Sequence, residues 1–243
     1  MTTTDTTGAS PTDTAIRNVV LVHGAFADGS GWRGVYDVLT ARGYRVSVVQ
    51  NPLTSFDDDV AATRRVLDQQ DGPAILVGHS WGGTVITEAG THDRVAGLVY
   101  VAALIPDSGQ TSGEQYEGFA ATPDFVIDIG EDGFGYLDRD AFQRGFAADV
   151  ADSEAAFMRD TQVPVNMAVF AQPVTEAAWR SRPSWAVYGT EDKAFDQAML
   201  QHMAERAGAA VTTVEGSHAV YLTQAGTVAD VITTAAEKAS AER

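Results

Sequence analysis

The fold of this chain is decided by residues 74–83, AILVGHSWGG. The apolar first half of this stretch predicts a short buried strand, and the residues after it, 84–89, predict the first turns of a helix. A strand that runs into a helix through so tight a turn presents the residue at the apex, Ser80, above the sheet. Gly78 and Gly82 flank the apex because a residue without Cβ leaves room where the strand and the helix approach each other.

Ser80 therefore stands in a Gly-x-Ser-x-Gly pattern that is typical of a nucleophile elbow. The pattern alone is weak, since a turn rich in glycine and serine would also satisfy it. Its place between a buried strand and a helix favours the elbow. The helix that starts directly after Ser80 also offers free N–H groups and a positive dipole end to an oxyanion formed there.

Apolar strands alternate with helices on both sides of this elbow. Before it we expect strands over 18–22 and 44–50 and helices over 32–41 and 57–70, and after it a strand over 95–102. The alternation resumes later, with strands over 184–188 and 210–215 and helices over 197–207 and 224–238. Strands that are apolar throughout are buried on both faces. They indicate an α/β fold, with a mostly parallel, doubly wound sheet of about six strands and helices on both faces.

Between these two parts, residues 104–182 are irregular and rich in proline and aromatic residues. Short helical patterns over 139–147 and 153–159 predict a helical cap that is inserted over the sheet. The N-terminal segment is rich in Thr, Asp, Ser and Gly, which is typical of a disordered tail. The expected organisation is a tail over 1–15 and a single α/β domain over 16–243, with core segments 16–103 and 183–243 and a cap over about 104–182.

The composition limits the possible partners. The 243 residues include 33 acidic and 16 basic side chains, which gives a formal net charge of −17. This charge argues against binding to nucleic acid or to an anionic membrane surface, because both need basic patches. The chain has no cysteine, which excludes disulfides, thiolate metal sites and a cysteine nucleophile. No signal peptide and no apolar run that could span a bilayer are found, so we expect a cytoplasmic protein.

A serine hydroxyl needs a neighbouring base to act as a nucleophile at neutral pH. His218 follows the last predicted strand in the sequence EGSHA, so its loop leaves the same edge of the sheet as Ser80, where open α/β sheets bind ligands. The base in turn needs a carboxylate that fixes its tautomer. Asp192, in the sequence YGTED, is the first choice. Its neighbour Glu191 and, more seriously, Asp107, which follows an earlier strand at the same edge, are the alternatives.

The other histidines are expected to be structural. His79 directly precedes the candidate nucleophile and should point into the core or toward neighbouring helices. His23 should hold the loop after the first strand by hydrogen bonds, and His92 and His202, on or near helix ends, should be solvated. The histidines are scattered and no His-Glu-x-x-His pattern or dinucleotide-binding glycine motif is present, so we expect neither a metal nor a cofactor.

An oxyanion formed at Ser80 needs two backbone N–H donors. We assign one to Trp81, at the start of the helix, and the other to Ala25 in the loop after the first strand, with Phe26 close behind. The Trp81 side chain either walls the pocket or packs under the cap. Aromatic residues of the cap suggest an apolar substrate pocket, and the candidate lining residues are Phe26, Trp81, Phe119, Phe125 and Phe170.

These motifs resemble the α/β-hydrolase superfamily, and most closely the branch that holds plant methyl esterases, hydroxynitrile lyases and small bacterial cofactor-free esterases. The matching segments are 21–25, 78–83, 102–108, 190–193 and 215–218. The chain order Ser80, Asp192, His218 is the order of the triad in this superfamily. The resemblance implies that these three residues form a catalytic triad, that the N–H groups assigned above stabilise the oxyanion, and that Asp107 is a structural or pocket residue.

Two positions depart from the lyases of this branch. The lyases carry a threonine at the position of Gly24 and a lysine directly after the catalytic histidine, where this chain has Ala219. Both differences favour ester hydrolysis, since a lyase needs a cation near the leaving cyanide. The resemblance therefore implies a serine hydrolase that cleaves small or medium-sized, largely apolar carboxylic esters through an acyl-enzyme intermediate.

Other functions on the same fold stay open at this point. They are lactone hydrolysis, acyl transfer, a reaction like that of the hydroxynitrile lyases, and the binding function of a small-molecule receptor with a slow triad. The expected partner is a small-molecule ester, without nucleic acid or membrane. The oligomeric state is left open between a monomer and a homodimer.

Overall fold

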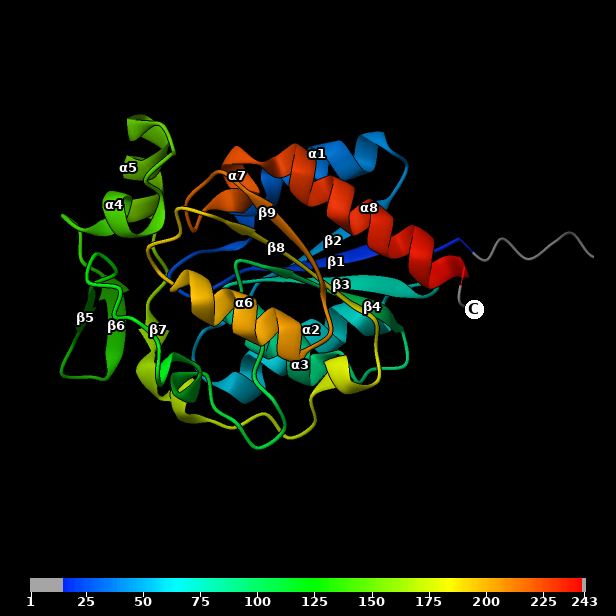
Figure 1. The fold of residues 1–243 in the computed structure, drawn as a ribbon, viewed down its shortest axis with the longest axis horizontal. Helices are drawn as coiled ribbons and strands as arrows, with labels where there is room; N and C mark the ends of the chain where they lie inside the picture. The colour runs from blue at the N-terminus through cyan, green and yellow to red at the C-terminus, as the bar shows by residue number, and fades with distance from the viewer. Residues whose placement is uncertain (1–14, 242–243) are drawn as a thin grey trace, which may run out of the picture.

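Six parallel strands form the central sheet of the protein, in the order β2-β1-β3-β4-β8-β9 (Figure 1). The structure is a computed structural model that describes residues 15–241. The strands run over Asn18–Val22 (β1), Arg45–Val49 (β2), Ala74–His79 (β3), Val95–Val101 (β4), Ser184–Gly189 (β8) and Ala210–Val214 (β9). Every neighbouring pair is parallel, so the predicted mostly parallel α/β sheet is confirmed.

Helices cover both faces of this sheet, as expected from its apolar strands (Figure 1). One face carries α1 (Arg33–Ala41), preceded by the short 3-10 helix η1 (Gly29–Trp32), together with α7 (Val220–Thr223) and α8 (Ala225–Ala241). The other face carries α2 (Phe56–Asp68), α3 (Trp81–Ala89) and α6 (Gln197–Arg206). All residues of β1 and β3 are buried as a result. A strand that is apolar on both faces is stable only in such a three-layer arrangement.

The start of α2 and the end of α1 follow ordinary rules of helix termination. The Ser55 hydroxyl accepts the N–H of Asp58 at 3.1 Å, which satisfies one of the free donors at the start of α2. Asp57, Asp58 and Asp59 occupy the first turn, where negative charge interacts favourably with the helix dipole. After α1, Gly43 has a φ of +82° and ends the helix.

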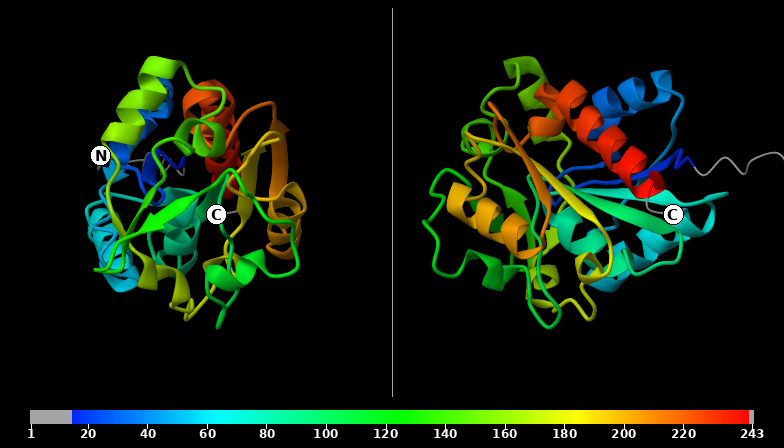
Figure 2. Two further views of the ribbon diagram at one scale, coloured as in Figure 1. Left: turned by 90° about the vertical axis from the view of Figure 1, so that its left-hand side faces the viewer. Right: turned by 45° about the vertical axis from the view of Figure 1, so that its right-hand side comes forward.

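The insertion between β4 and β8 lies at the carboxyl ends of the central strands (Figures 1 and 2). It contains α4 (Phe142–Phe146), α5 (Asp152–Asp160), the 3-10 helices η2 (Gly113–Tyr116), η3 (Met167–Ala171) and η4 (Ala178–Arg180), and a small sheet of β5 (Ile127–Ile129), β6 (Phe134–Leu137) and β7 (Val165–Asn166). The helical patterns over 139–147 and 153–159 correspond to α4 and α5. The antiparallel small sheet was not predicted, because its strands are only three, four and two residues long.

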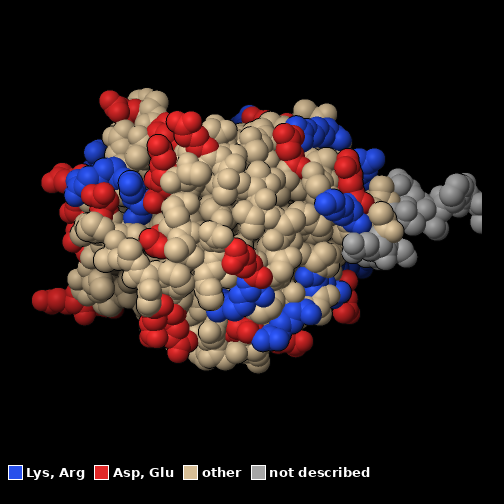
Figure 3. Space-filling model, in the orientation of Figure 1, with Lys and Arg blue, Asp and Glu red and all other residues tan. Residues whose placement is uncertain are grey.

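The structure also bears on the expected surroundings of the protein. The predicted tail over 1–15 lies outside the described residues, except for Ala15. Within residues 15–241, no helix is both long enough and apolar enough to cross a bilayer. On the face shown in Figure 3, acidic and basic side chains are interspersed around the rim, and the middle carries few charges. This face of the described chain therefore presents no continuous basic surface.

Candidate active site

Ser80 lies at the sharp turn between β3 and α3, as predicted. Its φ of +52° belongs to the region that favours glycine, so the turn is strained. The turn is held in part by the Ser80 N–H, which donates to the carbonyl of Val101 at 3.2 Å. A Cβ on Gly78 would lie 2.4 Å from the carbonyl oxygen of Gly82, and one on Gly82 would lie 2.6 Å from that of Val22. Both positions therefore require glycine, and Ser80 is left facing a cavity.

His218 and Asp192 form a buried pair at the same edge of the sheet. His218, in the loop after β9, donates from Nδ1 to Oδ2 of Asp192, in the loop after β8, at 2.8 Å. Both side chains are fully buried. The other carboxylate oxygen, Oδ1, accepts the N–H groups of Ala194 at 2.8 Å and Phe195 at 2.9 Å. The carboxylate fixes the imidazole tautomer with its proton on Nδ1, so Nε2 is left as an acceptor.

The imidazole of His218 packs against two of the rings that line the cavity with Ser80. Nε2 of His218 is buried and, among residues 15–241, has no hydrogen-bond partner, Ser80 Oγ included. The rings of Phe125 and Phe195 line the cavity with Ser80, and their centroids lie 6.2 and 4.8 Å from that of His218. His79, the residue before Ser80, donates from Nε2 to the carbonyl of His218 at 3.0 Å. Hydrogen bonds between catalytic groups are often long in unliganded enzymes and tighten with substrate.

Asp107, the serious alternative to Asp192, has a different partner. Its carboxylate accepts bonds from Arg180, from Nε at 2.6 Å and from Nη2 at 2.5 Å. These bonds hold the pKa of Asp107 below its usual value. Glu191, the other alternative, is exposed. Of the three carboxylates, Asp192 is therefore the one that the structure brings to His218.

Of the four remaining histidines, three lie where the sequence predicts them and His92 is less exposed than expected. The backbone N–H of Asn51 donates to Nε2 of His23 at 2.8 Å, and Nδ1 of His23 donates to the carbonyl of the next residue at 2.9 Å. Burial lowers the pKa of His23, so it holds this loop as a neutral imidazole. His79 is buried, and burial lowers its pKa well below the ordinary value. His202 is exposed, as expected. His92 is half-buried, and its Nε2 lies 3.1 Å from Oδ1 of Asp68.

Within residues 15–241, two backbone N–H groups near Ser80 are free to bind a negatively charged oxygen. The N–H groups of Ala25 and Trp81 donate to no acceptor within the described chain, and both residues line the cavity with Ser80. Gly24 allows this close approach, because a Cβ there would lie 2.8 Å from the Cβ of Ser80. Phe26 follows with a φ of +62°. The geometry is compatible with the oxyanion hole that the sequence suggests.

The cavity has a volume of about 310 Å³ and a largely aromatic lining. Four of the five predicted lining residues border it: Phe26, Trp81, Phe125 and Phe170. Phe119 does not, and its ring faces His202 instead, with centroids 5.6 Å apart. The sequence missed seven further lining residues, Leu104, Gly113, Tyr116, Thr122, Ile127, Met167 and Phe195. Most of them belong to the short strands and turns of the insertion, where no periodic pattern marks the inward side.

Of the two places that the sequence left open for the Trp81 side chain, the structure shows packing under the insertion, with the ring centroid 5.2 Å from that of Phe170. Trp81 is also one of the residues that line the cavity. None of the described residues that line the cavity is charged. Within residues 15–241, no group of three His, Asp or Glu side chains comes together that could hold a metal ion.

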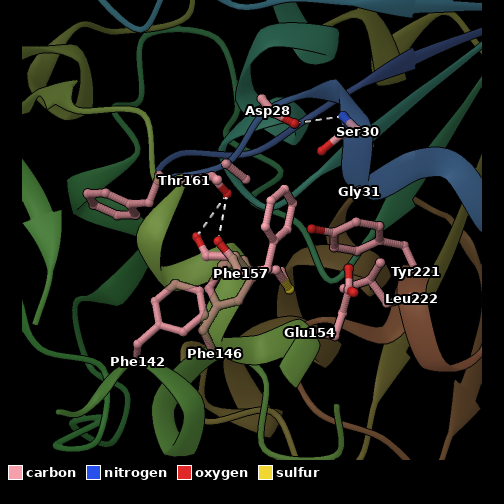
Figure 4. Close-up of a pocket in the computed structure, with 13 residues that line it drawn as sticks. Asp28, Ser30, Gly31, Phe142, Phe146, Glu154, Phe157, Thr161, Tyr221 and Leu222 are labelled. Atoms are coloured by element: carbon pink, nitrogen blue, oxygen red, sulfur yellow. Dashed lines mark hydrogen bonds between the residues drawn. The ribbon is translucent and has the colours of Figure 1, made fainter. Parts of the chain in front are cut away.

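A second, much smaller crevice shares the lining residue Phe26 with this cavity, and Figure 4 shows its surroundings. Its volume is about 30 Å³, and it lies among the loop at Asp28 and Ser30, the α5 residues Glu154 and Phe157, and Tyr221 of α7. This space corresponds to about one water molecule. The crevice is thus too small for a substrate, and the cavity at Ser80 is the candidate site.

Comparisons with known proteins agree with the fold of the chain. The family model of the alpha/beta hydrolase family matches residues 19–231. A pyrethroid hydrolase from Sphingobium wenxiniae (strain DSM 21828 / CGMCC 1.7748 / JZ-1) is 36% identical over 111 residues, which are 40% of this chain and 39% of that protein. In this match the chain thus spans well under half of the length of its relative.

Solved structures extend the likeness over nearly the whole chain. A crystal structure of the pyrethroid hydrolase PytH has a TM-score of 0.81 at 23% identity and covers 91% of this chain and 98% of that chain. The methylesterase MES16 from Arabidopsis has a TM-score of 0.76 at 18% identity and covers 92% of this chain and 100% of that chain. At these identities, the TM-scores show that the proteins share a fold. The predicted resemblance to a group that includes plant methyl esterases is confirmed.

Proposed function

The chain belongs to the alpha/beta hydrolase family, and from this premise we propose that it hydrolyses carboxylic esters, with Ser80 as nucleophile, His218 as base and Asp192 as the orienting carboxylate. The observation that carries this proposal is the buried His218–Asp192 pair. It leaves Nε2 of the imidazole as a bare acceptor, and the imidazole packs against Phe125 and Phe195, which line the cavity with Ser80. A base without another partner at this place is what a serine nucleophile requires.

The reaction follows from these groups. Nε2 of His218 takes the proton of Ser80 Oγ while Oγ attacks the ester carbonyl, and the N–H groups of Ala25 and Trp81 stabilise the resulting oxyanion. The imidazolium, stabilised by Asp192, then gives its proton to the leaving alcohol. A water molecule, deprotonated by the same imidazole, attacks the acyl-enzyme, and the acid product leaves with Ser80 restored.

The cavity favours an uncharged ester. Its lining is aromatic and aliphatic, and its volume of about 310 Å³ is at the lower end of the range for small-molecule sites, about 300–1,000 Å³. The likeness to a pyrethroid hydrolase and to a plant methylesterase supports an ester with a bulky apolar part. We therefore propose esters of small or medium size with aromatic or branched apolar groups as the substrate class.

Two positions support hydrolysis over cyanohydrin cleavage. A threonine at position 24 would need its Cβ 2.8 Å from the Cβ of Ser80, so the backbone there accommodates only glycine. The residue after His218 is Ala219, which supplies no cation for a leaving cyanide. Lactone hydrolysis and acyl transfer use the same groups and remain alternatives for the products of this site.

The proposal is tested by hydrolysis of p-nitrophenyl butyrate by the native protein and by Ser80→Ala. We expect the variant to lose at least about 10³-fold in kcat. Ser153→Ala, an exposed serine on α5, is the matched control and should keep native turnover. An organophosphonate should add to the native protein once, at Ser80, as read by mass spectrometry. Full turnover by Ser80→Ala would refute the assignment.

A further inference from the structure

A second buried carboxylate lies next to the candidate site. Asp59, on α2, is fully buried. Its Oδ2 accepts the indole Nε1–H of Trp81 at 2.8 Å, and its Oδ1 accepts the backbone N–H of Leu53 at 2.8 Å. In the described chain it pairs with no Lys, Arg or His side chain. A carboxylate without a cation is costly to bury, so hydrogen bonds to these two donors are what hold it there.

Trp81 is the residue through which Asp59 reaches the site. It follows Ser80 in the chain, it is fully buried, and it is one of the residues that line the cavity. The ring lies edge-on to Phe56 of α2 and to Phe170 of the insertion, with centroids 5.6 and 5.2 Å apart. These edge-on contacts favour certain ring arrangements but include no hydrogen bond. Among the described residues, Asp59 is the one that accepts a hydrogen bond from the indole Nε1–H.

The same carboxylate also holds the segment that meets the insertion. Leu53, whose N–H it accepts, has a φ of +57°, a conformation that leucine rarely adopts. The carbonyl of Leu53 accepts the N–H of Asn166, in β7, at 2.9 Å. Asp59 thus lies where α2, the residue beside the nucleophile and the insertion come together.

We propose that Asp59 is a positioning residue that fixes the indole of Trp81 as a wall of the cavity and so determines which acyl groups fit beside Ser80. The claim about acyl groups rests on the proposed ester hydrolysis. The claim that Asp59 orients the Trp81 indole is independent of the reaction. Asp59 touches neither the substrate nor the reacting atoms, and it acts only through the indole.

The charge state of Asp59 offers a direct readout of this contact. Burial raises the pKa of Asp59 to about 6, and the hydrogen bonds from Trp81 and Leu53 counteract part of that rise. The groups that face it from α3 and from the Leu53 segment, an indole N–H and a backbone N–H, are uncharged. The charged neighbour that raises its pKa further is Asp58 on the same helix. The indole proton of Trp81 should therefore respond to pH near this value.

The first experiment follows the four tryptophan indole resonances in a ¹H–¹⁵N spectrum of ¹⁵N-labelled protein. Trp81→Phe keeps an aromatic ring, removes Nε1–H and so assigns one resonance. In the native protein this resonance should move between about pH 5 and about pH 7, with a midpoint of about 6. In Asp59→Asn it should shift and no longer titrate. Asp57→Asn, an exposed neighbour on the same helix, is the matched control and should behave like the native protein.

The second experiment compares p-nitrophenyl acetate with p-nitrophenyl benzoate. Asp59→Asn places an amide N–H₂ group against either the indole N–H of Trp81 or the backbone N–H of Leu53. The indole should then tilt, and the cavity should fit the larger benzoyl group less well. We expect KM for the benzoate to rise about tenfold and the kcat for the acetate to stay within about twofold of native. The double variant Asp59→Asn/Trp81→Phe should be no worse than Trp81→Phe alone, because Asp59 acts through the indole N–H.

The outcomes separate this proposal from the proposed function. If Asp59→Asn leaves the Trp81 resonance in place, or reduces turnover of both esters equally, the positioning role is wrong. If the native protein turns over no ester while the Trp81 resonance titrates as described, ester hydrolysis is wrong and the control of Trp81 by Asp59 stands. Should Asp59→Asn fail to fold, the titration of the native resonance and the benzoate-specific loss in Trp81→Phe decide the question.

Discussion

Both oxygens of the Asp192 carboxylate act as hydrogen-bond acceptors. Oδ2 accepts the Nδ1–H of His218, and Oδ1 accepts two backbone N–H groups. In Asp192→Asn the two backbone N–H groups favour the amide oxygen at the Oδ1 position, which places the amide nitrogen against the ring. The imidazole then loses the acceptor that holds its proton on Nδ1.

We expect Asp192→Asn to lower kcat for p-nitrophenyl butyrate by about 10⁴-fold while KM changes little. Asp107→Asn is the matched control. It removes the charge that pairs with Arg180, outside the cavity, and should leave kcat within about twofold of native. Equal losses in the two variants would show that Asp192 has no special role.

Asp59 should also make stability depend on pH. Its pKa is about 6 in the folded protein against 3.8 for the free group, so between these values the folded state binds more protons than the unfolded state. The contribution of this group is therefore fully present below about pH 3.8 and is lost as pH rises through about 6. The loss is on the order of 3 kcal/mol if the whole pKa difference is expressed.

Urea unfolding of the native protein and Asp59→Asn across this pH range measures the effect. The difference in unfolding free energy between the two should change in favour of the variant as pH rises, because the amide does not ionise. A difference that is constant with pH would mean that Asp59 has an ordinary pKa in the folded protein.

At the scale of elements, the elbow depends on backbone-to-backbone approach. Gly82→Ala places a Cβ 2.6 Å from the carbonyl oxygen of Val22, in β1, so α3 and the sheet must separate. We expect a loss of about 1–3 kcal/mol in the free energy of unfolding, measured by urea denaturation. Gly226→Ala, on α8, meets nothing within 4 Å and should be neutral or stabilising. Equal effects of the two changes would mean that the elbow tolerates a methyl group.

How well the sequence predicts each element depends on how strongly that element is patterned. β1 is found with the predicted bounds. No end of the strands β2, β4, β8 and β9 differs from its predicted position by more than one residue. The agreement is close because the apolar runs stop at turn residues. β5, β6 and β7 are too short to show a period, and the sequence misses them. Their packing is decided by tertiary contacts that no local pattern carries.

The candidate site shows the same division. Ser80, Asp192 and His218 follow from the rule that the loops after parallel strands share one edge of the sheet, and the structure brings their loops together. Phe119 is predicted to line the cavity from its aromatic character alone, and it lies outside the cavity. The sequence does not single out Asp59, because its burial depends on the approach of Trp81 from another helix.

For the whole molecule, net charge and cavity lining act in the same direction. The chain carries a formal charge of −17, and none of the described residues that line the cavity is charged. An anionic ester is repelled during approach and must lose its hydration without gaining a cation. A neutral ester of similar size meets neither obstacle.

We therefore expect kcat/KM for p-nitrophenyl hemisuccinate to be at least about tenfold below that for p-nitrophenyl butyrate at low salt. Raising the salt from about 0.1 M to about 1 M shortens the screening length from about 10 Å to about 3 Å and should narrow this gap only in part. The difference in kcat/KM that remains at high salt reflects the cost of removing water from the anion in a cavity without a cation. Equal rates for the two esters would point to a cation that reaches the bound substrate.

The two ends of the described chain meet on the side of the sheet away from the insertion. The backbone N–H of Ile16 donates to the hydroxyl of Ser240 at 2.9 Å, and the C-terminal end of α8 lies opposite α4, α5 and the small sheet (Figure 1). A tag or a surface anchor attached at either end would thus leave the mouth of the cavity unobstructed. The same proximity makes the described part of the chain a candidate for circular permutation, with residues 15 and 241 joined by a short linker on the side away from the insertion.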